Sequence, residues 1–320
     1  MIKGTDLVPL PMTFGTLLFS IIGFIGNSII LIVTSRNKQL NSRCGFLIAS
    51  LAGVDTVICG YLIQLRVMIL FDNVMLSNYS CFSHSVHGIF CLSVQSFLGL
   101  TIGFDRLLAV SFPTKYNNLP MFIHALFILS SLAFASVITI FGFFDSNSTL
   151  IVPVCMPPTA FNFKSRLTWI GASFLLGILT LFVYITAHVK CAKLQKSVDR
   201  ANTQSLLKLK RLLNSLTIIV ILYTSTWFLT VCALFITQVA ARDTPLSRGI
   251  EQQLAWLVIT NASLNVFIYY WRAPEYRKAI RSLVCIKRFR VLEPSVTLPS
   301  VRKNESRARI TSNSLISNRF

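Results

Sequence analysis

The sequence predicts an all-α protein, a seven-transmembrane helix bundle with a short amphipathic helix after span seven. Of the 320 residues, 53% are hydrophobic and 13% charged, whereas soluble domains carry about 25% charged residues. The apolar residues gather in seven runs of membrane length, and the basic residues lie mostly between these runs and in the tail. Lipid, and not a large aqueous core, is therefore the expected environment of most helix surfaces.

The expected spans follow from length, because about 20 mainly apolar residues cross the hydrocarbon layer. They lie at 11–34, 45–69, 84–108, 121–144, 166–189, 208–238 and 252–271. The third and seventh runs contain Ser, Thr, Gln and Asn throughout. We expect these two helices at the centre of the bundle, because lipid cannot satisfy polar side chains.

The predicted organisation has four segments. A short extracellular N-terminus (1–10) precedes the seven-transmembrane domain (11–271), and a membrane-surface helix (272–285) leads into a disordered cytoplasmic tail (286–320). The tail is rich in Ser, Thr, Arg and Asn and has few apolar clusters, a composition typical of disorder.

The basic residues predict the orientation. The net charge is +19, which in a soluble protein favours nucleic acid, but no nucleic acid partner is expected for a chain of spans. All but six of the 30 Lys and Arg residues lie on the side of the tail. The tail is therefore expected to be cytoplasmic and the N-terminus outside. The six on the outer side are Lys3, Arg66, Lys164, Arg166, Arg242 and Arg248.

Several residues near the loops are candidates for covalent modification. Only Cys81 and Cys155 of the eight cysteines lie on the oxidising outer side, where they either form a disulfide over the mouth of the bundle or remain two thiols. The outer loops carry sequons at Asn78 and Asn147, which predict glycosylation. Cys285 ends a basic amphipathic stretch, a position typical of palmitoylation.

Polar residues inside the spans form the main functional signal. A carboxylate within a membrane is costly and is by default a functional hypothesis. Such residues recur at particular places in successive spans: Asn27, Asp55, Asp105, Arg106, Asn265 and Tyr269.

With their surroundings, these residues resemble the motifs of rhodopsin-like G-protein-coupled receptors over residues 12–285. The family's GN pair is similar to Gly26-Asn27, its LAxxD to 51–55, and its DRY triplet to Asp105-Arg106-Leu107. Its sixth and seventh span motifs are similar to 223–229 and 265–269, but both prolines are missing. The segments "LNSRCGFLIASLAGVD" and "LTIGFDRLLAVSFPTKY" look most like the nematode srsx serpentine chemoreceptors.

The resemblance implies a coupling site at the inner end of span three. Asp105 would hold Arg106 at rest, and activation would release Arg106 toward the G protein. Tyr184 and Tyr269 would meet Arg106 in the active state. The alternative for Arg106 is an interfacial arginine that only reaches the lipid headgroups.

The resemblance also implies a buried polar cluster of Asn27, Asp55 and Asn265 that links spans one, two and seven. In many relatives such a cluster holds sodium together with a serine from span three. The matching position here is Gln95, whose longer side chain we expect to fill the pocket and to hydrogen-bond Asp55.

In span six, Tyr223 and Trp227 would couple the ligand pocket to helix movement, or would only pack, as most large aromatic residues in spans do. Leu229 and Val266 replace the two missing prolines. We expect less kinking there, because proline removes a backbone hydrogen bond.

The implied function is a plasma-membrane receptor that senses an extracellular chemosensory small molecule or peptide and activates a heterotrimeric G protein. Gly88 stands where amine receptors have an Asp, which disfavours an amine ligand. The inner basic stretches would contact the G protein or anionic membrane lipid. No metal, cofactor or enzymatic activity is expected. The alternatives are a secondary transporter, for which no internal repeat is present, or an orphan seven-helix protein without G-protein coupling.

Overall fold

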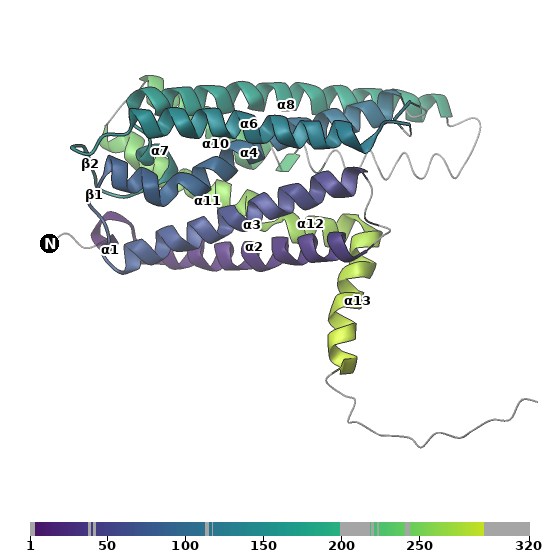
Figure 1. The fold of residues 1–320 in the computed structure, drawn as a ribbon, viewed down its shortest axis with the longest axis horizontal. Helices are drawn as coiled ribbons and strands as arrows, with labels where there is room; N and C mark the ends of the chain where they lie inside the picture. Colours follow the sequence, from purple (N-terminus) through teal and green to yellow (C-terminus); the bar gives the residue numbers. More distant parts are fainter. Residues whose placement is uncertain are drawn as a thin grey trace, which may run out of the picture. The chain divides into compact units, whose positions relative to one another are not determined.

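The computed structural model describes residues 4–37, 40, 43–112, 115–116, 118–198, 218, 221–222, 224–240 and 244–290. The chain divides into two compact units, Met1–Leu283 and Val284–Phe320, and only 284–290 of the second is described. The elements in chain order (Figure 1) are α1 (Gly4–Leu7), α2 (Leu10–Arg36), α3 (Arg43–Leu70), β1 (Leu76–Ser77), α4 (Asn78–Ser111), α6 (Met121–Asp145), β2 (Ile151–Val152), α7 (Pro157–Ala160), α8 (Phe163–Val198), the π-helix η1 (Thr224–Phe228), α10 (Leu229–Ala240), α11 (Pro245–Ser263), α12 (Asn265–Arg272) and α13 (Pro274–Arg290).

Five helices of the described chain are long and apolar enough to cross a membrane, namely α2, α3, α4, α6 and α8. They coincide with the first five expected spans. Of the sixth expected span, the structure describes mainly η1 and α10, whereas most of 199–223 lies outside the described residues. The seventh is represented by α11 and α12, which are separated at Leu264.

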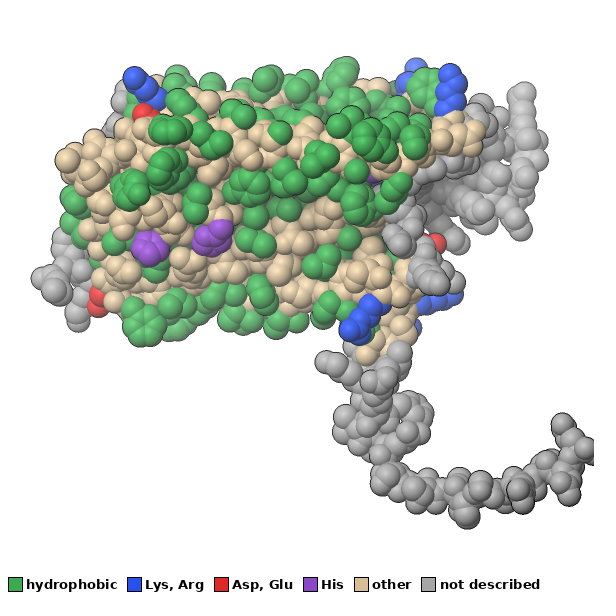
Figure 2. Space-filling view, in the orientation of Figure 1, with side chains coloured by type: hydrophobic (Ala, Val, Ile, Leu, Met, Phe, Trp, Pro, Cys, Tyr) green, Lys and Arg blue, Asp and Glu red, His purple; other side chains and the backbone are tan. Residues whose placement is uncertain are grey.

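The helix surfaces have the polarity that a lipid environment requires. Large apolar side chains are exposed along the helices; examples are Phe14, Val137, Phe144 and Phe182. On the face shown in Figure 2, hydrophobic side chains cover the flanks of the bundle, and Lys and Arg lie near its ends. A soluble protein rarely exposes so continuous an apolar surface.

α4 is the central helix, as expected for span three. In its most apolar stretch 72% of the residues are buried, compared with 22% in α6. α4 packs against α3, α6 and α8, while α2 packs against α3, α11 and α12. The main core cluster draws on α3, α4, α8, η1, α10 and α11 and includes Tyr61, Phe82, Phe161, Trp169, Trp227 and Ile259.

The first part of α13 packs on the inner ends of α2 and α3. Tyr276, Ala279 and Ile280 share an apolar cluster with Ile30 and Val33. The hydroxyl of Thr34 donates a hydrogen bond to Tyr276 Oη over 3.1 Å. The expected membrane-surface helix therefore begins at Pro274, and its helical geometry continues past 285 to Arg290.

Span three begins six residues earlier than the expected residue 84, because local caps extend the helix. The Ser77 side chain caps the N-terminus by accepting a hydrogen bond from the Ser80 backbone N–H over 3.2 Å. Ser77 also belongs to β1, which pairs antiparallel with β2. The outer loops and the start of α4 thus form one hydrogen-bonded unit.

The two helices that lack a proline are irregular near the missing prolines, although the expectation of less kinking there stays a prediction. η1 is a π-helix that ends directly before Leu229, and α11 ends directly before Leu264, two residues before Val266. In η1, Thr226 Oγ1 donates to Leu222 O, and Thr230 Oγ1 donates to Thr226 O, each over 2.6 Å. Hydroxyl groups that bond carbonyls four residues earlier compete with the helix ladder and bend helices.

Gly88 permits a close approach between α4 and α3. A Cβ at this position would lie 2.1 Å from Cδ1 of the Tyr61 ring, and Tyr61 is fully buried. Tyr61 therefore occupies the space into which an aspartate at this position would project.

We predict that Gly88→Ala lowers the thermal stability of the purified protein by roughly 1–3 kcal/mol, the usual cost of overpacking a core. The matched control is Gly171→Ala in α8, where an added Cβ meets nothing within 4 Å and helix propensity improves. Thermal unfolding in detergent measures both variants. Equal stability of the two variants would contradict the packing argument.

Candidate functional site

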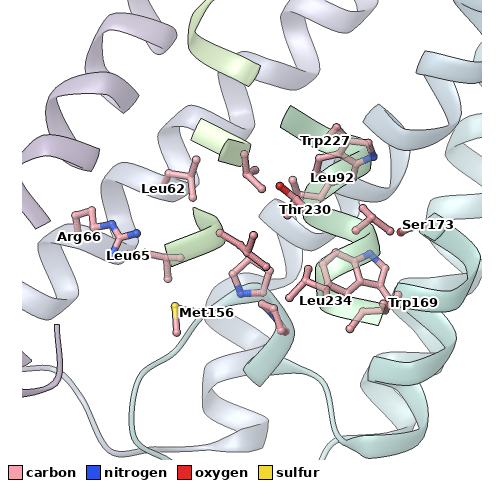
Figure 3. Close-up of a pocket in the computed structure, with 16 residues that line it drawn as sticks. Leu62, Leu65, Arg66, Leu92, Met156, Trp169, Ser173, Trp227, Thr230 and Leu234 are labelled. Carbon is pink, nitrogen blue, oxygen red and sulfur yellow. The ribbon is translucent and has the colours of Figure 1, made fainter. Parts of the chain in front are cut away.

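A cavity lies between α3, α4, α8, the η1–α10 segment and α11, with α7 and Met156 at one side (Figure 3). It contains about 750 Å³ of space without atoms, part of which is open to solvent. In Figure 3, Met156 and Trp227 lie on opposite sides of the cavity. Met156 follows directly on Cys155, which forms a disulfide with Cys81. The loop that contains Cys155 therefore supplies one wall of the cavity.

The cavity lining is almost entirely apolar. Its few polar side chains are Arg66 on α3, Ser173 on α8, Thr230 on α10 and the indole N–H groups of Trp169 and Trp227. Thr230 is already engaged as a donor to Thr226 O. Ligand pockets typically combine apolar walls with a few fixed polar groups, and this lining has that character.

A disulfide between Cys81 and Cys155 ties the loop before α8 to the start of α4, which confirms the expected pairing. The same loop pairs as β2 with β1, with Leu76 opposite Val152. β1, β2, α1 and α7 lie together at one end of the bundle (Figure 1). The loop therefore forms a fixed cover over that end.

Asn78 has a structural role in the folded loops. Its side chain is fully buried, and its amide donates to the carbonyls of Thr159 and Ala160 and accepts from the Asn147 backbone N–H. A glycan on this amide would require these contacts to break, which disfavours the glycosylation that the sequon predicts. Asn147 is exposed, and its Oδ1 accepts hydrogen bonds from both the backbone N–H and the hydroxyl of Thr149.

Asp55 is the centre of the buried polar cluster. Gln95 of α4 donates to Oδ1 and Asn265 of α12 donates to Oδ2, each over 2.5 Å. The hydrogen bond from Gln95 is the one expected from the sequence. Two neutral amides thus occupy both oxygens of a fully buried carboxyl group.

Asn27 lies in the same layer but has different partners. Its Nδ2 donates to the carbonyls of Gly23 and Ala262, over 3.0 and 2.8 Å. It therefore joins span one to the backbone of span seven, and the structure shows no hydrogen bond from it to Asp55. Its Oδ1 is buried without a hydrogen-bond partner in the part of the chain that is described.

Asp105 at the inner part of α4 is held by residues that the sequence analysis did not single out. Its Oδ1 accepts from Tyr116 Oη over 2.9 Å and contacts His124 Nε2 at 3.0 Å. Its Oδ2 is buried, with no hydrogen-bond partner among the described residues. Asp105 is thus contacted by the following loop and by α6, and the expected pairing with Arg106 stays a prediction.

Arg106 is half-buried beside Asp105 on α4. Tyr184 is buried on α8 and lies close to Gly103 of α4, one turn before Arg106. Tyr269 packs on Tyr276 with 5.2 Å between ring centroids. The structure therefore places Tyr184 against α4 and Tyr269 against α13.

Trp227 is 4% exposed and forms part of both the cavity wall and the main core cluster. Tyr223, which the family resemblance places with Trp227 in the coupling of ligand pocket and helix movement, lies outside the described residues. The side chain of Cys285 in α13 also lies outside them. Within the described chain, no group of three or more His, Cys, Asp or Glu side chains is arranged to hold a metal ion.

The sequence contains signals for two further buried residues, Arg66 and His124, that were not identified as candidate site residues. Arg66 was considered only as one of six outer basic residues, although a lone arginine in "YLIQLRVMIL" is an ionisable residue within a span. His124 in "MFIHALF" is a comparable signal in span four, and it is 1% exposed.

A family model described as "Serpentine type 7TM GPCR chemoreceptor Srsx" matches residues 20–284. The chain belongs to the Srsx family. The resemblance seen in the motifs is therefore confirmed, and the matched region contains the cavity, the disulfide and the Asp55 cluster. Srsx is a family of multi-pass membrane receptors and not a family of enzymes.

We predict that this Srsx protein carries an outer-side glycan at Asn147 and none at Asn78. Thr149→Ala, which removes the acceptor motif of Asn147, should abolish the mobility shift caused by glycosidase. Ser80→Ala removes the motif of Asn78 without touching its amide and should leave the shift unchanged. Gel mobility of protein from eukaryotic cells is the measurement. A shift lost in Ser80→Ala would contradict the burial argument.

We also predict that sodium does not change ligand affinity, because Gln95 and Asn265 already occupy both oxygens of Asp55. Ligand affinity should stay within about twofold when sodium replaces potassium or choline at constant ionic strength, which removes the general effect of screening. Gln95→Ser shortens the side chain, and a sodium effect that appears only in this variant would support the explanation. A clear sodium effect in the unmodified protein would refute it.

Proposed function

We propose that the chain is a chemosensory receptor that crosses the plasma membrane seven times, with its N-terminus outside and its tail in the cytoplasm. It binds an extracellular ligand in the cavity between α3, α4, α8, α10 and α11 and activates a heterotrimeric G protein. Membership of the Srsx family over residues 20–284 is the observation that carries this proposal. The excess of basic residues on the tail side supports the orientation.

The cavity supports the location of the ligand site. It lies toward the end of the bundle with the disulfide-linked loop, which is the outer end in the proposed orientation. Trp227 belongs to both the cavity wall and the irregular η1. A ligand that contacts Trp227 would therefore act directly on the helix segment whose geometry departs from the α-helix.

The coupling site lies at the other end of α4, around Arg106. Tyr116 and His124 hold Asp105 and thereby fix the loop after α4 and the start of α6 against this end. We propose that these contacts help to set the resting position of the coupling site, and that Tyr184 and Tyr269 approach Arg106 upon activation.

The segments outside the bundle have roles that follow from this orientation. The apolar side of α13 packs on α2 and α3, and its exposed Lys278 and Arg281 would face anionic headgroups. Residues 272–285 would then form a membrane-surface helix with a palmitoylated Cys285, and 286–320 a cytoplasmic tail. Residues 1–10 would be extracellular.

The decisive test compares the unmodified chain with Arg106→Ala in cells that carry reporters for several G-protein classes. We expect ligand-free signalling, or a response to an extract, to fall in the variant to about a tenth or less, which corresponds to at least ~1.4 kcal/mol of coupling free energy. Surface levels are matched by an N-terminal epitope tag, which also reports the orientation.

Lys164→Ala is the matched control. Lys164 is an exposed basic residue at the start of α8, and its sequence position lies outside the basic stretches assigned to G-protein or lipid contact. Its removal should leave signalling nearly unchanged. Normal signalling by Arg106→Ala would overturn the coupling role, and silence of the unmodified chain in every reporter would favour transport or a function without G protein.

A further inference from the structure

Arg66 is an unusual residue for its position. It lies on α3 within the membrane-length segment Gly45–Leu70, and its side chain is only 3% exposed. Its Nε is buried without a hydrogen-bond partner in the described chain. Figure 3 shows the guanidinium group extending from α3 toward the other residues that line the cavity.

No acidic side chain among the described residues neutralises Arg66. The His124–Asp105 contact is the one pair within 4.0 Å in that part of the chain that can form a salt bridge, and it lies at the inner end of α4. An arginine does not lose its proton in a protein. A buried charge is costly unless a counter-charge and hydrogen-bond acceptors accompany it, and the described residues supply no counter-charge to Arg66. An anion in the cavity would therefore be a favourable partner for Arg66.

The other polar groups of the cavity also favour an acceptor. The indole N–H groups of Trp169 and Trp227 are buried and have no hydrogen-bond partner in the described structure. Both belong to the cavity lining, and none of the described lining residues carries a carboxylate. Among these residues a cationic ligand would meet one fixed positive charge and no counter-charge, whereas an anionic ligand would meet a partner.

The rest of the lining defines the remainder of the ligand. Leu62, Leu65, Leu92, Val231 and Leu234 give the cavity apolar walls on several sides. A dianion such as a phosphate monoester needs more than one cation. One guanidinium group matches one carboxylate, with which it forms two parallel hydrogen bonds.

We propose that this cavity binds an apolar carboxylic acid in its ionised form, with the carboxylate paired to Arg66 and the hydrocarbon part between α4, α8 and α10. This inference names the ligand class for the site in the proposed function, and its use as a sensor rests on that proposal. Arg66 is thereby the residue that determines ligand specificity.

Binding is tested on the purified full chain in lipid nanodiscs, by the shift in Tm that each probe causes. The probes are straight-chain carboxylates of four to ten carbons and 3-phenylpropanoate, each beside its methyl ester, which has the same apolar part without the charge. We expect one or more carboxylates to raise Tm in a saturable way, and their esters to bind at least about tenfold more weakly.

Three variants locate the effect. Arg66→Met keeps an unbranched, flexible side chain but removes the charge, and should abolish the preference for acid over ester. Arg66→Lys keeps the charge but cannot form the bidentate pair of hydrogen bonds with a carboxylate. This variant should therefore bind the carboxylates with intermediate affinity. Lys164→Met removes an exposed cation from the start of α8 and should behave as the unmodified chain, which excludes a general attraction of anions.

The outcomes separate this inference from the receptor proposal. Carboxylate binding that depends on Arg66, in a chain that activates no G protein, would uphold the ligand class and overturn the receptor proposal. Signalling that depends on Arg106, in a chain whose Tm is raised by no carboxylate, would uphold the receptor proposal and overturn the ligand class. Equal binding of acid and ester by the unmodified chain overturns the inference even if Arg66→Met does not fold.

Discussion

The hydrocarbon of a membrane cannot satisfy a buried polar group, and this constraint organises the whole bundle. Asp55 shows it most directly, because it is fully buried and obtains its hydrogen bonds from two other helices. Gln95 belongs to the central α4 and Asn265 to the start of α12. One carboxyl group therefore fixes the mutual positions of spans two, three and seven, and Asn27 adds span one through the backbone of α11.

The two ends of α4 are fixed by different means. At the outer end, the Cys81–Cys155 disulfide, the β1–β2 pairing and the buried amide of Asn78 hold the loop before α8. At the inner end, Asp105 is held only by hydrogen bonds from Tyr116 and His124. One end fixed by a covalent bond and the other by hydrogen bonds would suit the proposed receptor, whose ligand site would stay constant while the opposite end rearranges.

The sequence was sufficient for the first five spans, because they depend on apolar length. It also placed Cys81 and Cys155 on one side of the bundle, and the family resemblance led to the contact between Gln95 and Asp55. It was insufficient where tertiary contacts decide. The burial of Asn78 depends on carbonyls of Thr159 and Ala160, some 80 residues away, and a sequon carries no information about them. His124 lies in an apolar run of the sequence, and its structural role becomes apparent only from its contact with Asp105 on another helix.

The motif of span six did not predict the π-helical turn before Leu229 either, because a missing proline gives no indication of a π-turn. A π-turn closes its hydrogen bonds over five residues in place of four, so side chains after Phe228 are displaced by about one position, or ~100°, around the helix axis. A single α-helical wheel drawn through 224–240 consequently assigns wrong faces to the residues on one side of the π-turn. An alignment that treats this segment as one uninterrupted α-helix misplaces the same side chains.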